Sequence, residues 1–185
     1  LPIYIGLEKA GQELLQNPEF AQSKAGGEVR SVLEKANFKR AQDLEKEGKL
    51  KESAEQFEEF FIQNPKSDLA LTALFNAAVN FEKAGENTKS LGLYQKLVDN
   101  PNGAKTYGPQ VYRFLAKLYQ SASIFDESIK NYKLAIQASP KDPLVANFHY
   151  NIALMADSQG RLTEAYQNYS EYLSLTKRNS DKKEA

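Results

Sequence analysis

The sequence predicts an all-α protein, an α-solenoid of antiparallel helix pairs with about four repeats and one additional N-terminal helix. In segment 109–140, large apolar residues recur three and four positions apart in two runs, separated by a turn at 121–123. This spacing places them on one face of each of two helices. A similar pattern begins near residues 34, 71 and 146, at intervals of 37 or 38 residues. Two amphipathic helices cannot bury both apolar faces alone, whereas stacked repeats share a continuous core.

Turn-forming residues delimit the N-terminal part of the chain. Pro18 disfavours helix at the residue before it, so we expect a first helix over residues 3–16. Ala25-Gly26-Gly27 is predicted to be a break or hinge, and residues 1–27 then form an N-terminal cap or the end of a preceding repeat. The predicted repeats span residues 28–65, 67–101, 109–140 and 143–177. Their helices are expected at 28–47, 50–63, 67–84, 87–98, 109–120, 124–138, 144–159 and 162–176.

Three places are predicted to lie outside helices or at their ends. Residues 99–108 begin with a run of turn formers and are expected to form the longest loop between repeats. Pro109 then starts a helix, where its missing N–H is no loss. Asp142 can cap the helix that Pro143 starts. The polar tail 178–185 is expected to fray.

The repeats share one order of side-chain types: large, large, small and large in the first helix, then a turn, a small residue, an aromatic residue and a closing proline. In the third repeat these residues are Tyr112, Leu115, Ala116, Tyr119, Ser128, Tyr132 and Pro140. This order resembles the tetratricopeptide repeat, and the resemblance covers about residues 28–177. The first repeat departs from this order, with Asn37 and Arg40 where large apolar residues belong. The fourth repeat has Lys177 where the proline would fall. The resemblance implies a right-handed superhelix in which the first helix of each pair lines a concave groove that binds other proteins.

The resemblance also indicates which residues line that groove. They are Lys35, Phe38, Gln42, Thr72, Phe75, Asn76, Val79, Gln110, Arg113, Lys117, Asn147, Tyr150, Asn151 and Leu154. Phe38, Phe75 and Tyr150 occupy equivalent positions, so an exposed series of aromatic residues is expected there, with Val79 and Leu154 one turn further on. Such a patch, bordered by polar residues, is typical of a site for a peptide or an amphipathic helix. The alternative is that these aromatic residues pack against a neighbouring helix.

Composition argues against several other classes of function. The 24 basic and 24 acidic residues cancel, which disfavours a nucleic-acid partner, and no apolar run is long enough to insert in a membrane. There is no cysteine and only one histidine, His149, so we expect no metal, no cofactor and no catalytic residues. His149 has no carboxylate one turn away and is expected to pack partly buried. The sequence therefore predicts that the protein is not an enzyme.

The first hypothesis for function is a non-catalytic scaffold that binds a protein or peptide partner, within a bacterial envelope assembly. The segment from Phe57 to Ser67 resembles the repeats of outer-membrane assembly lipoproteins and Tol-Pal coordinating proteins, which favours a periplasmic or envelope location. The alternative is a structural spacer or self-association module of a larger protein, with its groove filled by another part of the same chain. A homo-oligomer is left open. One variant of the family grips a C-terminal carboxylate with a set of basic and amide side chains. Only Asn76 matches that set, so this mode is not expected. The chain starts Leu-Pro-Ile, and we expect it to be a processed or excised fragment.

Overall fold

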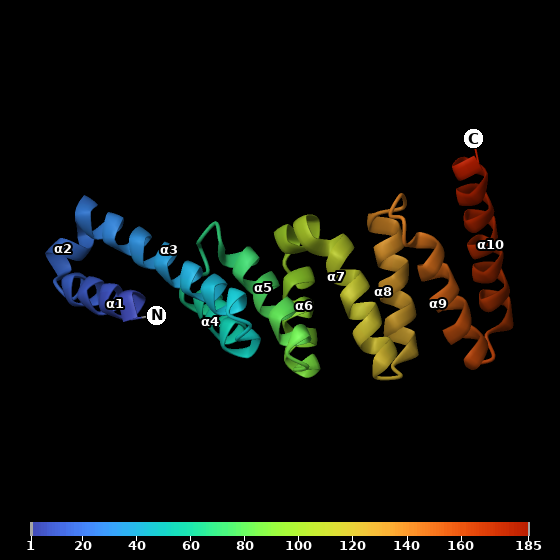
Figure 1. The fold of residues 1–185 in the computed structure, drawn as a ribbon, viewed down its shortest axis with the longest axis horizontal. Coiled ribbons are helices and arrows are strands. Elements are labelled where there is room, and N and C mark those ends of the chain that lie inside the picture. The colour runs from blue at the N-terminus through green and yellow to red at the C-terminus, as the bar shows by residue number, and fades with distance from the viewer. Residues whose placement is uncertain (1, 185) are drawn as a thin grey trace. The chain divides into compact units, whose positions relative to one another are not determined.

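The computed structural model describes residues 2–184, and all the regular elements within them are helices (Figure 1). In chain order these are α1 (Pro2–Leu15), α2 (Pro18–Gln22), α3 (Lys24–Lys46), α4 (Leu50–Gln63), α5 (Ala70–Lys83), α6 (Asn87–Asp99), α7 (Pro101–Ser121), α8 (Phe125–Ala138), α9 (Val145–Ser158) and α10 (Leu162–Glu184). The chain forms two compact units, unit 1 (Leu1–Leu93) and unit 2 (Tyr94–Ala185). The predicted all-α fold class is confirmed.

In unit 1, buried hydrogen bonds join three successive helices. Ser53 Oγ on α4 donates to the carbonyl oxygen of Ala41 on α3 at 2.7 Å, and Asn80 Nδ2 on α5 donates to Ser53 Oγ at 3.0 Å. All three residues are buried, so water does not compete for these bonds. The small side chain of Ala41 lets α4 approach α3 closely enough for the first bond to form.

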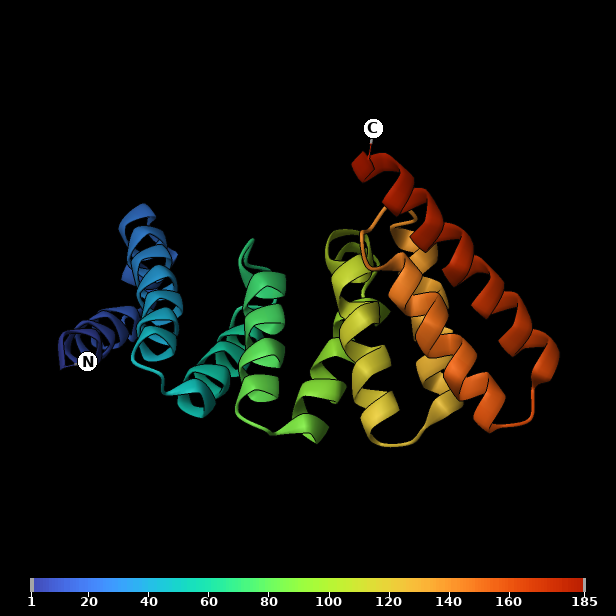
Figure 2. The ribbon, with the colours of Figure 1, turned by 45° about the vertical axis from the view of Figure 1, so that its right-hand side comes forward.

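Unit 2 repeats this arrangement between α7 and α8. Ser128 Oγ donates to the carbonyl oxygen of Ala116 at 2.8 Å, and Ala116 has no exposed surface. The close helix contact predicted at Ala116 is therefore confirmed. Helix α9 packs against both α8 and α10 (Figure 2), and Phe148 and Ile152 on α9 belong to the same core cluster as Ala116.

The N-terminal segment differs from its prediction. Gly26 and Gly27 do not form a break, because they lie in the first turn of α3. The breaks fall earlier, at Asn17 and Ser23. Asn17 Oδ1 caps the short helix α2 by accepting the backbone N–H groups of Glu19 and Phe20, and Ser23 Oγ caps α3 by accepting the N–H of Gly26. A side chain at Gly26 would place its Cβ 2.1 Å from the carbonyl oxygen of Phe20. The glycine is therefore needed for the close approach of α2 and α3, not for a hinge.

The predicted loop 99–108 is also wrong, because α7 begins at Pro101 and contains Pro109 in its interior. Asn100 Oδ1 accepts the N–H groups of Asn102 and Gly103, both at 3.0 Å, and Pro101 occupies the first turn. The run of turn formers is thus a helix start. Pro109 donates no hydrogen bond within the helix, so the packing of α7 must offset that loss.

The other helix positions follow the predicted pattern, with shifts at their ends. Helix α4 has the predicted bounds, and α9 begins at Val145 after Asp142 Oδ1 accepts the N–H of Leu144 at 2.8 Å. Helix α10 continues to Glu184, beyond its predicted end. Ala185 lies outside the described residues, and fraying of the tail stays a prediction.

Candidate functional site

The aromatic position of the first repeat is a packing site. The Phe38 ring contacts the rings of Phe57 and Phe60 on α4, with centroids 5.2 and 5.4 Å away and edge-to-face geometry. Phe38 is only 8 % exposed. The expectation that Phe38 is exposed is therefore wrong. The physical reason is that Phe38 lies one turn before Ala41 and so shares the helix face that meets α4.

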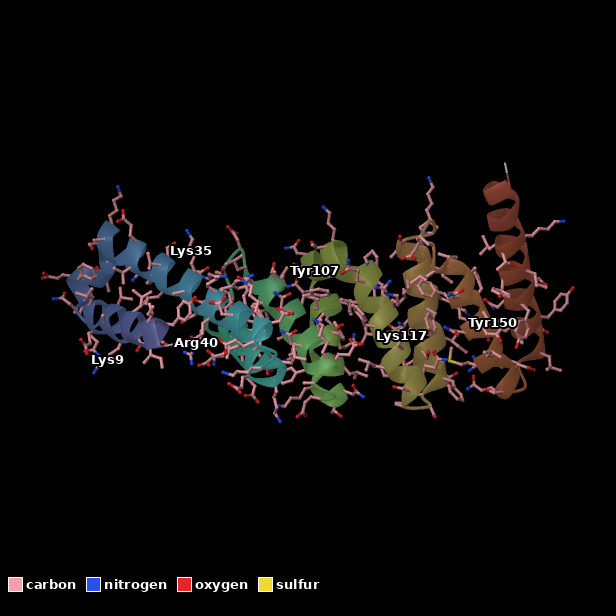
Figure 3. All side chains as sticks on the ribbon, in the orientation of Figure 1. Lys9, Lys35, Arg40, Tyr107, Lys117 and Tyr150 are labelled. Atoms are coloured by element: carbon pink, nitrogen blue, oxygen red, sulfur yellow. The ribbon has the colours of Figure 1, made fainter. Side chains whose placement is uncertain are left out.

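Tyr150 makes the equivalent ring contacts in the fourth repeat but has a different exposure. Its ring contacts those of Tyr169 and Tyr172 on α10, with centroids 6.1 and 5.1 Å away. The side chain nevertheless remains 40 % exposed, at the side of α9 that meets α10 (Figure 3). We call Tyr150, Tyr169 and Tyr172 the tyrosine cluster. Partial burial raises the pKa of the Tyr169 phenol, with a further contribution from Asp157, so the hydroxyl stays protonated at neutral pH.

Polar and apolar residues of α9 surround the tyrosine cluster. Asn147 is exposed, and Leu154 is exposed one turn beyond Tyr150. Asn151 is held in place, because its Nδ2 donates to Tyr132 Oη at 3.1 Å, while that hydroxyl donates to Gln120 Oε1 at 2.9 Å. Burial raises the pKa of Tyr132, which keeps this donor protonated. The chain of bonds links α9, α8 and α7 beneath the site.

Helix α7 adds positive charge to the same unit. Gln110, Arg113 and Lys117 share one face of this helix, and Arg113 and Lys117 are the repeat equivalents of Tyr150 and Leu154. Gln110 and Lys117 are exposed, whereas Arg113 is half-buried with its guanidinium 5.3 Å from the Phe114 ring centroid. Among the side chains that the structure describes, residues 3–177, no carboxylate forms an ion pair with either cation. Figure 3 marks Lys117 on α7.

The remaining predicted site residues lie in unit 1. Lys35 on α3 is exposed. The others, Gln42 on α3 and Thr72, Phe75, Asn76 and Val79 on α5, are all half-buried. They leave less side-chain surface to a partner than Tyr150, Leu154 and the α7 residues do. Whether these unit 1 residues contact a partner stays a prediction.

Sequence reasoning missed part of the site because it assigned Tyr169 and Tyr172 only to helix packing. A signal was present at Tyr172, which occupies the position held by Ala135 in the preceding repeat. An aromatic residue there extends the packing surface under Tyr150. His149 is half-buried, as expected, and its Nδ1 lies 2.9 Å from Asn168 Oδ1.

The site offers aromatic surface, amide groups and cations. Across the described part of the chain, no cluster of three or more histidine, cysteine or acidic residues could hold a metal ion. Among the helices described, none is long and apolar enough to cross a membrane. The arrangement suits recognition of another polypeptide.

Successive helix pairs joined by tight turns, with small residues at the contacts, define the α-solenoid class. Proteins of this class present extended surfaces to other molecules. The family model of the tetratricopeptide repeat matches residues 38–105 and 115–181, so this chain belongs to the tetratricopeptide repeat family. The family mediates protein–protein interaction, and this chain is accordingly expected to have protein partners.

Solved structures support the same fold. A crystal structure of MamA is similar with a TM-score of 0.64 and 16 % identity, covering 97 % of this chain and 93 % of MamA. MamA from Desulfovibrio magneticus is similar with a TM-score of 0.58 and 12 % identity, covering 95 % of this chain and 96 % of the MamA chain. A kinesin light chain from Podosopora anserina with nearly identical repeats is similar with a TM-score of 0.56 and 13 % identity. The match covers 94 % of this chain and 95 % of the kinesin light chain. At these identities the likeness shows the fold alone. A sequence comparison with curated proteins found no match.

Proposed function

We propose that this protein is a non-catalytic scaffold that binds a peptide or helix of a partner protein on the face of unit 2 formed by α7 and α9. The tyrosine cluster and Leu154 form the apolar part of the surface. Asn147 and Gln110 supply hydrogen-bonding groups, and Arg113 and Lys117 supply the charge. The partner segment is expected to carry an aromatic or aliphatic anchor next to acidic residues.

The observation that carries this proposal is the difference between Phe38 and Tyr150. Each ring contacts two rings of its own second helix, yet Phe38 is buried and Tyr150 remains 40 % exposed. A tyrosine supported on two sides loses little conformational entropy when a partner covers it, and its hydroxyl can bond to the partner. Aromatic residues of this kind are enriched in binding hot spots.

The test is a capture experiment with the wild-type protein and matched variants. Tyr150→Ala should reduce capture of a partner at least tenfold, because a hot-spot truncation costs about 2 kcal/mol or more. Leu144→Ala, which removes a partly exposed apolar side chain just before α9, should have no effect and serves as the control. Equal capture by the two variants would contradict the proposal.

The charged part of the site has its own test. Lys117→Glu should weaken the same partner and reduce the salt dependence of binding, since it removes a cation that faces acidic residues. Lys141→Glu, at an exposed position between α8 and α9, changes the net charge equally and should leave binding unchanged. If both variants bind alike, charge at α7 has no specific role.

We also propose that the scaffold acts in the periplasm, within a bacterial envelope assembly. The proposal rests on the absence of cysteine from the sequence and on the resemblance at the Phe57–Ser67 junction. Fractionation of the native organism should place the protein with periplasmic or envelope markers. Recovery with cytosolic markers alone would contradict this location.

A further inference from the structure

The outer face of α10 carries large apolar side chains: Leu162, Tyr166 and Leu173 are exposed, and Tyr169 is half-buried by its contact with α9. Leu162, Tyr166, Tyr169 and Leu173 recur at i, i+4, i+7 and i+11, so they form one ridge along the helix, about 17 Å long. We call these four residues the α10 ridge. Tyr166 is 74 % exposed and Leu173 is 64 % exposed. This is a large apolar surface to leave in water.

The preceding repeat shows how such a ridge is normally covered. The equivalent residues on α8 are Phe125, Ile129, Tyr132 and Ile136, which belong to or pack against the same core cluster as Phe148 of α9. Helix α9 lies against α8 (Figure 2). Ile129, the equivalent of Tyr166, is only 3 % exposed. The α10 ridge therefore has the pattern of an interface, and an apolar surface is required to complete it.

The residues beside the ridge also differ between the two helices. On α8 the neighbouring positions are Asp126, Lys130, Lys133 and Gln137, whereas on α10 they are Thr163, Gln167, Ser170 and Ser174. The charges are thus replaced by hydroxyl and amide groups. Depletion of charge beside exposed tyrosines is typical of the core of a protein–protein interface.

Unit 1 carries an unfilled apolar groove between α1 and α3. Its volume is about 390 Å³ and its lining includes Leu7, Gly11, Leu14, Val29, Val32 and Leu33. Leu14 and Val32 are each about half exposed. Glu28 is the one charged residue in this lining.

We propose that the α10 ridge of one copy of this protein docks in the α1/α3 groove of a second copy. The ridge is convex and apolar, and the groove is concave and apolar. The Thr163, Gln167 and Ser170 side chains beside the ridge of one copy can donate hydrogen bonds to Glu28 in the groove of the second copy. None of these three side chains carries a negative charge that would repel the Glu28 carboxylate. Because the ridge and the groove are different surfaces, the contact is heterologous, and each copy can bind one neighbour at each surface.

The size of the contact sets the expected strength. A helix face of about three turns in a two-helix groove buries on the order of 1,000 Å² in total, which lies at the low end of specific interfaces. Association should therefore be reversible and visible only at high protein concentration. The average mass should rise continuously with concentration, since a heterologous contact does not stop at two copies.

Sedimentation equilibrium over a wide concentration range tests the proposal. The wild-type mass should rise with concentration, whereas Tyr166→Glu and Val32→Glu should each remain monomeric because each loses one of the two surfaces. Ile124→Glu changes an exposed apolar residue outside both surfaces, and this variant should associate like the wild type. Circular dichroism confirms that each variant is folded, as expected for exposed positions.

Mixing the two monomeric variants gives the sharpest result. Tyr166→Glu retains an intact groove and Val32→Glu retains an intact ridge, so an equimolar mixture should form dimers and nothing larger. A wild-type protein that stays monomeric, or a mixture that stays monomeric, would overturn the proposal. So would association of Val32→Glu alone, because that would point to ridge-to-ridge contact.

Discussion

Ser123 adopts a left-handed backbone conformation in the turn between α7 and α8, with φ of 60°. The equivalent residues in the other three turns are Gly48, Gly85 and Gly160, with φ of 77°, 80° and 72°. This conformation costs a residue with a side chain about 1–2 kcal/mol, and glycine loses about 0.5–1 kcal/mol more backbone entropy on folding. The difference predicts that Ser123→Gly stabilises unit 2 by about 0.5–1 kcal/mol.

Two further variants test whether the left-handed conformation causes the change in stability. Gly160→Ser should destabilise by about the same 0.5–1 kcal/mol, and purely through backbone conformation. No atom lies within 4 Å of the position that a Cβ would take at Gly160. Ala122→Gly changes the adjacent residue, whose φ is −84°, and should destabilise by roughly 0.5–1 kcal/mol.

Urea unfolding followed by circular dichroism measures all three changes as shifts of the midpoint at constant slope. Opposite signs for Ser123→Gly and Ala122→Gly are the expected result. If both lower the midpoint, the strain assigned to Ser123 is absent and the reasoning is refuted.

Three other predictions use the same unfolding measurement. Ala116→Leu should destabilise by about 1–3 kcal/mol, because a larger side chain forces α7 and α8 apart, and an unchanged midpoint would contradict the close contact. Phe38→Ala should cost about 3–5 kcal/mol as an emptied core site, and Tyr150→Ala less than half of that. A hydrogen bond from Lys133 lowers the pKa of Glu164, so this pair stabilises the protein above the ordinary carboxyl pKa, and its contribution is lost as the pH falls through the lowered value. Glu164→Gln should therefore differ most from the wild type at neutral pH and converge with it in acid; a difference independent of pH would refute the pairing.

The repeats could be predicted from sequence because one requirement recurs in each of them. A small residue is needed wherever the second helix crosses the first, and large residues are needed around it. Ala41 and Ala116 satisfy this requirement 75 positions apart in the chain, and each carbonyl accepts a serine hydroxyl. Because the packing is periodic, the spacing of small and large residues in the sequence predicts it.

The start of α7 could not be predicted in the same way. Asn100-Pro101-Asn102-Gly103 has the composition of both a turn and a capped helix start, and local sequence does not separate the two. The packing around Gly103 favours the helix start over the turn. A Cβ at this position would lie 2.1 Å from the carbonyl oxygen of Leu97. The glycine lets α6 and α7 approach closely, and this contact is a property of the folded chain.

For the site, the sequence indicated positions but not the directions of the side chains. Phe38 and Tyr150 were assigned to equivalent positions, and their equivalent ring contacts agree with that assignment. Their exposure depends on what lies over each ring, which no spacing rule encodes. The sequence pattern therefore predicts a groove position in every repeat, while the structure leaves only some of those positions open.

The two proposed surfaces of unit 2 can be separated experimentally because Tyr169 is the one residue that the tyrosine cluster and the α10 ridge share. Tyr150 lies where α9 meets α10, whereas Tyr166 lies on the outer face of α10. Solenoid repeats are stabilised by contacts with their nearest neighbours, so a substitution on one exposed face is not expected to alter the other. Tyr150→Ala should consequently lose the partner and retain self-association, and Tyr166→Glu should do the reverse. Loss of both properties in either variant would mean that unit 2 has a single binding surface, with Tyr169, which belongs to both sets, at its centre.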